Sequence, residues 1–151
     1  MGTRGYYVIK WKRLYYIFYN HWDSYLEGLG ADIVKELREL TEADFDKIRS
    51  AMEGLKYDPI YECIKKKGYE GLMKLAENPN DYDLQDITKT PPESGGDIEY
   101  VYIVNLDVET FQVHFKQYTS AEIGNFEWEQ IDWEFPVKKI PENWIEQIDK
   151  K

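Results

Sequence analysis

Residues 15–30, YYIFYNHWDSYLEGLG, decide the fold of this chain. The stretch begins with an apolar segment of β-forming residues, continues through a dense polar and aromatic turn, and ends with two glycines. The residues that follow carry helical spacing, so the turn joins a strand to a helix. Turns that follow a buried strand often carry binding or catalytic residues, and this turn is the first place to look for a site.

The segments on either side of Lys12-Arg13 predict a β-hairpin. Tyr6 to Trp11 and Leu14 to Asn20 are rich in tyrosine, valine and isoleucine, and the dipeptide between them is short enough for a tight turn. Apolar residues occupy both odd and even positions of each segment. Because successive side chains of a strand point to opposite faces, the pattern predicts a central hairpin that is covered on both faces.

Helical spacing dominates the next part of the chain. One helix is predicted from Ala31 to Leu40. A second is predicted to follow Thr41, an N-cap residue whose capping box Asp44 approximates, and to run to about Leu55. Two further short helices are expected over residues 58–68 and 69–77.

The last third of the chain predicts strands and a closing helix. A second hairpin is expected from Ile98 to Leu106 and Phe111 to Tyr118. Phe126 to Phe135 alternates apolar and acidic residues with a slip at Gln130, which predicts an edge strand with a bulge. Pro141 to Ile148 is expected to close the fold with a short helix.

This order of elements predicts a single α+β domain over residues 1–151, with a largely antiparallel sheet built from two β-hairpins and covered by helices. Asn78 to Asp97 is irregular, and residues 90–97, TPPESGGD, are predicted to be a mobile loop because proline and glycine flank only polar residues. We expect one core to hold the following residues: Tyr16, Phe18, Ile33, Leu37, Phe45, Ile48, Val101 and Ile103.

Composition narrows the function classes. A formal net charge of −10 disfavours general affinity for nucleic-acid phosphates, because binding would begin from repulsion. No apolar run approaches the roughly 20 residues that span a bilayer, and the N-terminus lacks a secretory pattern. Cys63 is the single cysteine, and its apolar surroundings indicate a buried structural thiol. We expect a soluble, cytoplasmic protein that binds neither nucleic acid nor membrane.

Three motifs carry a resemblance to a family. MGTR at residues 1–4, YYxFYNHWDSYxEGLG at 15–30 and YVYIVNLDVETFQV at 100–113 resemble a group of short fungal and phage-type proteins. Members typically have proline where this chain has Leu26, so the turn is expected to be looser here. The family carries no established activity, and the resemblance therefore implies a shared fold more than a function.

A second resemblance concerns element order. An N-terminal hairpin followed by helices and another hairpin is similar to N-terminal-nucleophile hydrolases, which use the first residue of the processed chain as nucleophile. The dipeptide Gly2-Thr3 matches the position where such chains are cleaved. The resemblance implies Thr3 as a catalytic residue, with its free amine as base and oxyanion donors nearby.

The turn holds the candidate binding residues. In a recognition site, His21 would be an acid, base or hydrogen-bond donor, while Trp22 and Tyr25 would form a stacking wall. In the structural alternative, the shorter polar side chains satisfy backbone groups of a tight turn while the aromatic rings pack. The complete set is Asn20, His21, Trp22, Asp23, Ser24 and Tyr25, with Arg4 expected nearby.

Two other patterns are weaker. Gly28-Leu29-Gly30 before a helix could hold an anion, but the dinucleotide-binding pattern fails at Ile33, and turn glycines with positive φ are the favoured interpretation. His21 and His114 lie far apart in the sequence, and no histidine, cysteine or aspartate spacing matches a known set of metal ligands, so we expect no metal and no cofactor.

The favoured function is a non-catalytic binding or interaction module for an unknown small molecule or protein. The alternative is amide cleavage that uses Thr3.

Overall fold

The computed structural model describes residues 3–57, 66–95, 97–122 and 125–149, with the side chains of 117–129 and 149 outside the description. The greater part of the helix expected over residues 58–68, including Cys63, therefore lies outside the described residues. None of the helices in the described ranges combines the length and the apolar composition that crossing a bilayer requires.

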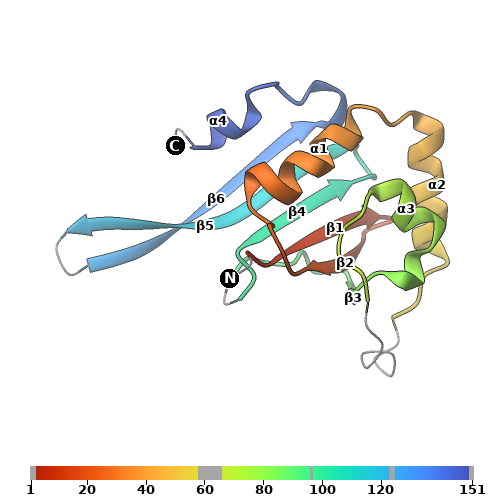
Figure 1. Ribbon diagram of the computed structural model, residues 1–151, viewed down its shortest axis with the longest axis horizontal. Coiled ribbons are helices and arrows are strands. Elements are labelled where there is room, and N and C mark those ends of the chain that lie inside the picture. The colour runs from red at the N-terminus through yellow and green to blue at the C-terminus, as the bar shows by residue number, and fades with distance from the viewer. Residues whose placement is uncertain (1–2, 58–65, 96, 123–124, 150–151) are drawn as a thin grey trace.

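A single six-stranded sheet forms the centre of the domain (Figure 1). Its order is β3-β2-β1-β4-β5-β6, and every neighbouring pair is antiparallel except β1 and β4, which are parallel. The predicted α+β class is confirmed, although the sheet holds more than two hairpins. The strands are β1 (Gly5–Trp11), β2 (Leu14–Asn20), β3 (Leu84–Thr88), β4 (Tyr100–Asn105), β5 (Thr110–Glu122) and β6 (Asn125–Pro136).

The first hairpin turns as predicted at Lys12 and Arg13. Both residues have positive φ, 51° and 67°, as a two-residue turn between twisted strands requires. Their backbone N–H groups donate to the two carboxylate oxygens of Asp107 at 2.8 and 3.1 Å. The turn between β4 and β5 thus holds the tip of the hairpin through these two hydrogen bonds. The hairpin is central as predicted, because β1 lies between β2 and β4 in the middle of the sheet.

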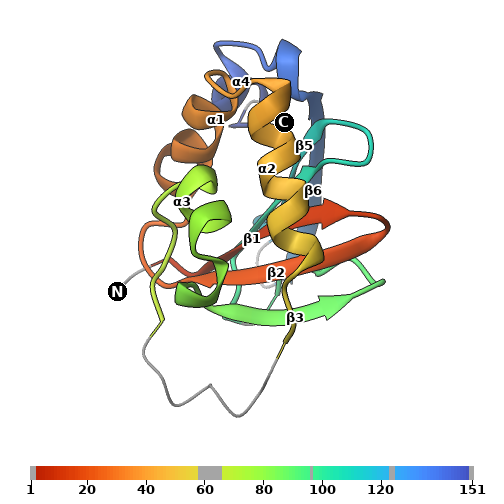
Figure 2. The same ribbon diagram turned by 90° about the vertical axis from the view of Figure 1, so that its right-hand side faces the viewer.

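The helices pack on one face of the sheet (Figure 2). Thr41 and Asp44 form the predicted capping box at the start of α2, with hydrogen bonds of 2.9 and 3.2 Å. A π-helical turn, η1, precedes α1 where the sequence predicted a plain strand-to-helix turn. The helical elements are η1 (Leu26–Gly30), α1 (Ala31–Leu37), α2 (Glu42–Glu53), α3 (Leu72–Glu77), η3 (Pro79–Asp81), η4 (Val137–Lys139) and α4 (Trp144–Asp149).

The sheet buries side chains on both faces, as the two-sided apolar pattern predicted. The main cluster lies between the sheet and the helices and holds six of the eight residues expected in one core. The prediction was wrong for Val101 and Ile103, which pack with Val8 and Ile17 on the opposite face. Because β4 is apolar at both odd and even positions, its sequence does not indicate which side meets the helices.

The connection from β3 to β4 contributes to the burial of this second face. Since β2 and β1 lie between β3 and β4, residues 89–99 have to cross both strands. Ile98, near the end of the connection, packs against the Val8 cluster, and Ser94 is 2% exposed. The sequence missed β3 because LQDIT lies among irregular residues. The mobility expected for residues 90–97, of which residue 96 is outside the description, stays a prediction.

β6 is one of the two edge strands of the sheet, which agrees with the predicted edge strand. The bulge was expected at the wrong place: Lys116 pairs with Gln130 in unbroken register, and the shift lies between Ser120 and Glu122 of β5. Gln130 donates to the Asp132 carboxylate at 2.8 Å. It therefore continues the polar side of the strand and does not interrupt the strand.

Candidate functional site

Asn20, the last residue of β2, organises the turn that follows. Its side chain is buried, and its amide nitrogen donates to the Trp22 carbonyl at 2.7 Å and to the Ser24 hydroxyl at 2.9 Å. Its amide oxygen accepts the backbone N–H of Tyr69 at 3.1 Å. One side chain thus fixes the turn to β2 and to the segment before α3. This matches the structural alternative for Asn20.

Ser24 is the second support. The residue is fully buried, its hydroxyl donates to the Asn20 carbonyl at 3.2 Å, and its N–H donates to the Thr3 carbonyl at 3.0 Å. Its own carbonyl accepts the hydroxyl of Tyr102, a core residue of β4, at 2.7 Å. The turn is therefore tied to the residues before β1, to β2 and to β4 through hydrogen bonds of a buried residue.

Gly28 is required by close approach. A Cβ atom at this position would lie 2.1 Å from the carbonyl oxygen of Asp23, which accepts the N–H of Leu29 at 2.8 Å. The prediction of positive φ was wrong for Gly28 and Gly30, since the described glycines with positive φ are elsewhere. Asp23 itself takes the left-handed conformation, with φ of 53°, which aspartate tolerates.

The aromatic residues of the turn lie at the surface. Trp22 is 63% exposed and Tyr25 is 38% exposed. The His21 ring meets the Trp22 ring edge to face, with centroids 4.5 Å apart, and its Nδ1 shares a hydrogen bond of 2.7 Å with the Tyr19 hydroxyl. The structure therefore separates the predicted residues into buried supports, Asn20 and Ser24, and a ring surface that they present.

This ring surface extends back onto the sheet. Tyr19 lies 5.9 Å from His21 and 6.4 Å from Tyr6 between ring centroids. Tyr6, Tyr19, His21 and Trp22 thus form a continuous row of rings, here called the aromatic row. Tyr6 and Tyr19 were not among the site residues predicted from the sequence. Cross-strand pairing of Tyr6 with Tyr19 is the signal that would have found them.

Charged side chains border the aromatic row. Arg4, which was expected near the turn, forms an ion pair of 3.5 Å with the exposed Asp97. The carboxylates of Asp23 and, more weakly, Glu27 raise the pKa of the Tyr25 hydroxyl by making its ionised form less favourable. Both carboxylates therefore lie near the Tyr25 hydroxyl.

Thr3 lies beside the turn through its carbonyl, which accepts the Ser24 N–H. The nucleophile role requires the free amine that cleavage before Thr3 would expose. Residues 1 and 2 lie outside the described residues, so the alternative based on Thr3 stays a prediction. Intact-mass measurement of the natural chain tests it, because cleavage before Thr3 removes two residues.

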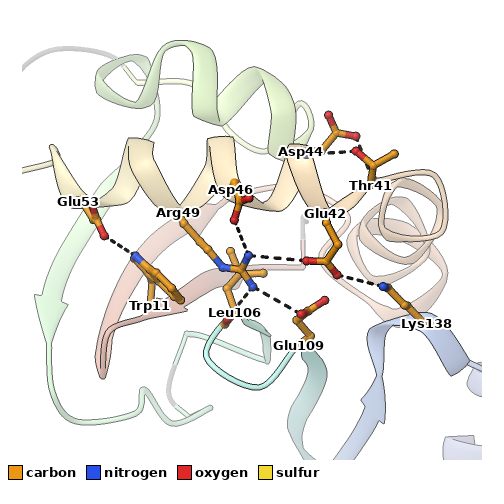
Figure 3. A network of polar contacts seen from close by, with 10 residues as sticks. All are labelled: Trp11, Thr41, Glu42, Asp44, Asp46, Arg49, Glu53, Leu106, Glu109 and Lys138. Atoms are coloured by element: carbon orange, nitrogen blue, oxygen red, sulfur yellow. Dashed lines mark hydrogen bonds and ion pairs between the residues drawn. The ribbon is translucent and has the colours of Figure 1, made fainter.

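Arg49 of α2 gathers a second cluster of polar side chains (Figure 3). Its side chain is 13% exposed, and Nη1 lies 2.9 Å from Asp46 and 3.9 Å from Glu42. Nη2 lies 3.7 Å from Glu109 and donates to the Leu106 carbonyl at 3.0 Å. A hydrogen bond between the Glu42 and Glu109 carboxyl groups raises the pKa of Glu109 and lowers that of Glu42. Arg49 thus joins α2 to the turn between β4 and β5.

The same cluster reaches β1 and the C-terminal part of the chain. The Arg49 guanidinium lies 4.9 Å from the centroid of the Trp11 ring, whose Nε1 donates to Glu53 at 2.9 Å. Lys138 forms an ion pair of 3.0 Å with Glu42. Because its groups connect elements that are distant in sequence, we interpret this cluster as part of the framework. The cluster was not predicted from the sequence, because its members come from β1, α2, the turn between β4 and β5, and η4.

Two hollows are lined by described residues away from the turn. One, of about 570 Å³, lies over Ala51 of α2 and Met73 of α3. The other, of about 240 Å³, lies beside α1 and is lined in part by Glu36, Glu39 and Glu70. Among the described residues, no group of three or more histidine, cysteine, aspartate or glutamate side chains is arranged to hold a metal ion.

Comparison with known proteins adds no relative. No family model, curated protein or solved structure matches the chain. The geometry of the turn is therefore the basis of the functional proposal.

Proposed function

We propose that the protein is a non-catalytic binding module whose contact surface is the turn after the first hairpin. Trp22 carries the proposal, because a large ring that is 63% exposed stands on a turn held by two buried polar side chains. His21 and Tyr25 flank it, and Tyr19 extends the surface onto β2.

The physical advantage lies in preorganisation. Tryptophan and tyrosine offer large contact areas at a small loss of side-chain freedom, and they are enriched at the energetic centres of interfaces. A fixed backbone removes the further free-energy cost of ordering a loop on binding. The hydrogen bonds of Asn20 and Ser24 supply this fixed backbone.

A display selection with counter-selection tests the proposal. A random peptide library is selected on the wild-type protein and depleted on the Trp22→Ala variant. Val108→Ala is the matched control, because Val108 is 64% exposed but lies on the turn between β4 and β5, far along the chain from Trp22. We expect peptides that bind the wild type and Val108→Ala alike and lose binding to Trp22→Ala. A library without such peptides would contradict the proposal.

A further inference from the structure

We propose that the turn and the aromatic row recognise a basic peptide segment of a partner protein, with lysine or arginine side chains lying over the rings and beside the carboxylates that border them. This inference rests on the proposed function and adds the chemistry of the ligand.

The rings supply one half of the recognition chemistry. The face of a tryptophan or tyrosine ring attracts a cation within about 6 Å, and the attraction is strongest for tryptophan. Trp22 is the most exposed of the described aromatic side chains of the turn, and it begins a row whose successive centroids lie 4.5, 5.9 and 6.4 Å apart. A row of this kind is an extended strip, which suits an extended peptide better than a compact small molecule.

Carboxylates supply the other half. Asp23 and Glu27 are exposed residues of the turn and of η1, and both act on the Tyr25 hydroxyl. Asp83 lies beside the middle of the row, where its carbonyl accepts the N–H of Tyr19 at 2.9 Å. Burial raises the pKa of the Tyr19 hydroxyl, the positive charge of Arg4 lowers it, and the negative charge of Asp83 raises it. Acids therefore lie at the turn, next to Trp22 in the chain, and beside Tyr19 in the middle of the row.

The basic residue among these groups is already neutralised in part. Arg4 pairs with Asp97, whose side chain is 84% exposed. Among the described residues, Asp23 and Glu27 add two negative charges to the Arg4–Asp97 pair, so negative charge exceeds positive charge around the turn. The formal net charge of −10 for the whole chain acts in the same direction on an approaching basic segment. Opposite charge on the partner would speed encounter and reject acidic competitors.

The test uses a labelled peptide that alternates lysine with serine, so that successive lysines of an extended chain lie on one side. The same peptide with glutamate in place of lysine is the negative probe. Fluorescence polarisation compares the wild-type protein with Trp22→Ala, with Trp22→Phe and with the double variant Asp23→Asn, Glu27→Gln. The control double variant Glu39→Gln, Glu77→Gln removes the same net charge from the helical side of the molecule.

We expect Trp22→Ala and the Asp23, Glu27 double variant each to weaken binding of the lysine peptide about tenfold, while Trp22→Phe retains part of it. The control double variant should change the affinity less than about twofold, since distant exposed charges are screened by salt. Equal weakening by both double variants, or equal binding of the glutamate peptide, would overturn the inference. If display yields Trp22-dependent peptides that lack lysine and arginine, the inference fails while the proposed function stands. If it yields none, both fail.

Discussion

The side-chain amide of Asn20 donates to the Ser24 hydroxyl at 2.9 Å, and both residues are buried while three residues between them reach the surface. Position in the turn therefore decides what each residue does. The first and fifth residues, Asn20 and Ser24, fix the backbone through hydrogen bonds, and the three residues between them place aromatic rings and a carboxylate at the surface. The functional and the structural interpretations of the turn are therefore compatible, because they apply to different residues.

Replacing Asn20 by alanine should destabilise the protein by about 3 kcal/mol, because the Tyr69 N–H and the Trp22 carbonyl would lose their partner inside the fold. His21→Ala, which removes a ring at the surface, should cost less than about 1 kcal/mol. Urea unfolding of the two variants measures both free energies. Similar costs for the two would show that the division between support and surface is incorrect.

Gly28→Ala should lower the free energy of unfolding by more than about 2 kcal/mol, since the new methyl group would lie 2.1 Å from the Asp23 carbonyl oxygen. Gly54→Ala is the control. Its nearest contact would be the Ala51 carbonyl at 4.0 Å, and it should be neutral or stabilising by up to about 1 kcal/mol. Thermal melts of the two variants compare these effects. Equal melting temperatures would rule out close approach as the reason for glycine at position 28.

The sequence predicted local elements well because their causes are local. The hairpin at Lys12-Arg13, the capping box of Thr41 and the edge position of β6 each follow from residues within a few positions of one another. Sequence patterns within a few residues directly reflect strand and helix propensity, helix capping and the alternation of apolar and polar residues.

What the sequence did not show depends on long-range pairing. The parallel contact of β1 with β4 decides that Val101 and Ile103 face away from the helices, and no pattern within β4 indicates it. Glycine is likewise needed at position 28 because the carbonyl oxygen of Asp23, five residues earlier, lies where a Cβ atom would be. Residue propensities do not predict this path of the backbone. The extent of the aromatic row was missed for the same reason, because Tyr6 joins it only across the hairpin.

Glu36 of α1 caps α3 from outside that helix. Its carboxylate accepts the backbone N–H groups of Leu72 and Met73 as well as the Tyr69 hydroxyl. Glu36→Ala should therefore cost about 2–3 kcal/mol. Glu39→Ala, an exposed change on the same helical surface, should stay within about 0.5 kcal/mol of wild type. Hydrogen exchange of the α3 amides should rise in the first variant, and unchanged protection would contradict this role for Glu36.

Alkaline pH should destabilise the protein through buried tyrosines. Burial, together with the hydrogen bond to Glu70, raises the pKa of Tyr82 to about 12, and burial also raises the pKa of Tyr69. The unfolded chain ionises tyrosine near pH 10. The stabilisation is thus complete below about pH 10 and is lost as the pH rises through about 12. Urea unfolding between about pH 8 and pH 11 should show this decline, and Tyr82→Phe should make it shallower. An identical decline in Tyr82→Phe would exclude Tyr82 as a contributor.

The binding role of the turn is tested most directly by measuring, on the same samples, the peptide affinity and the melting temperature of Trp22→Ala. Because Trp22 is 63% exposed, we predict a melting temperature within about 2 °C of wild type. Affinity for a peptide selected on the wild-type protein should fall at least about tenfold. Unchanged affinity, or a loss of affinity that accompanies a large drop in melting temperature, would contradict a binding surface carried by this turn.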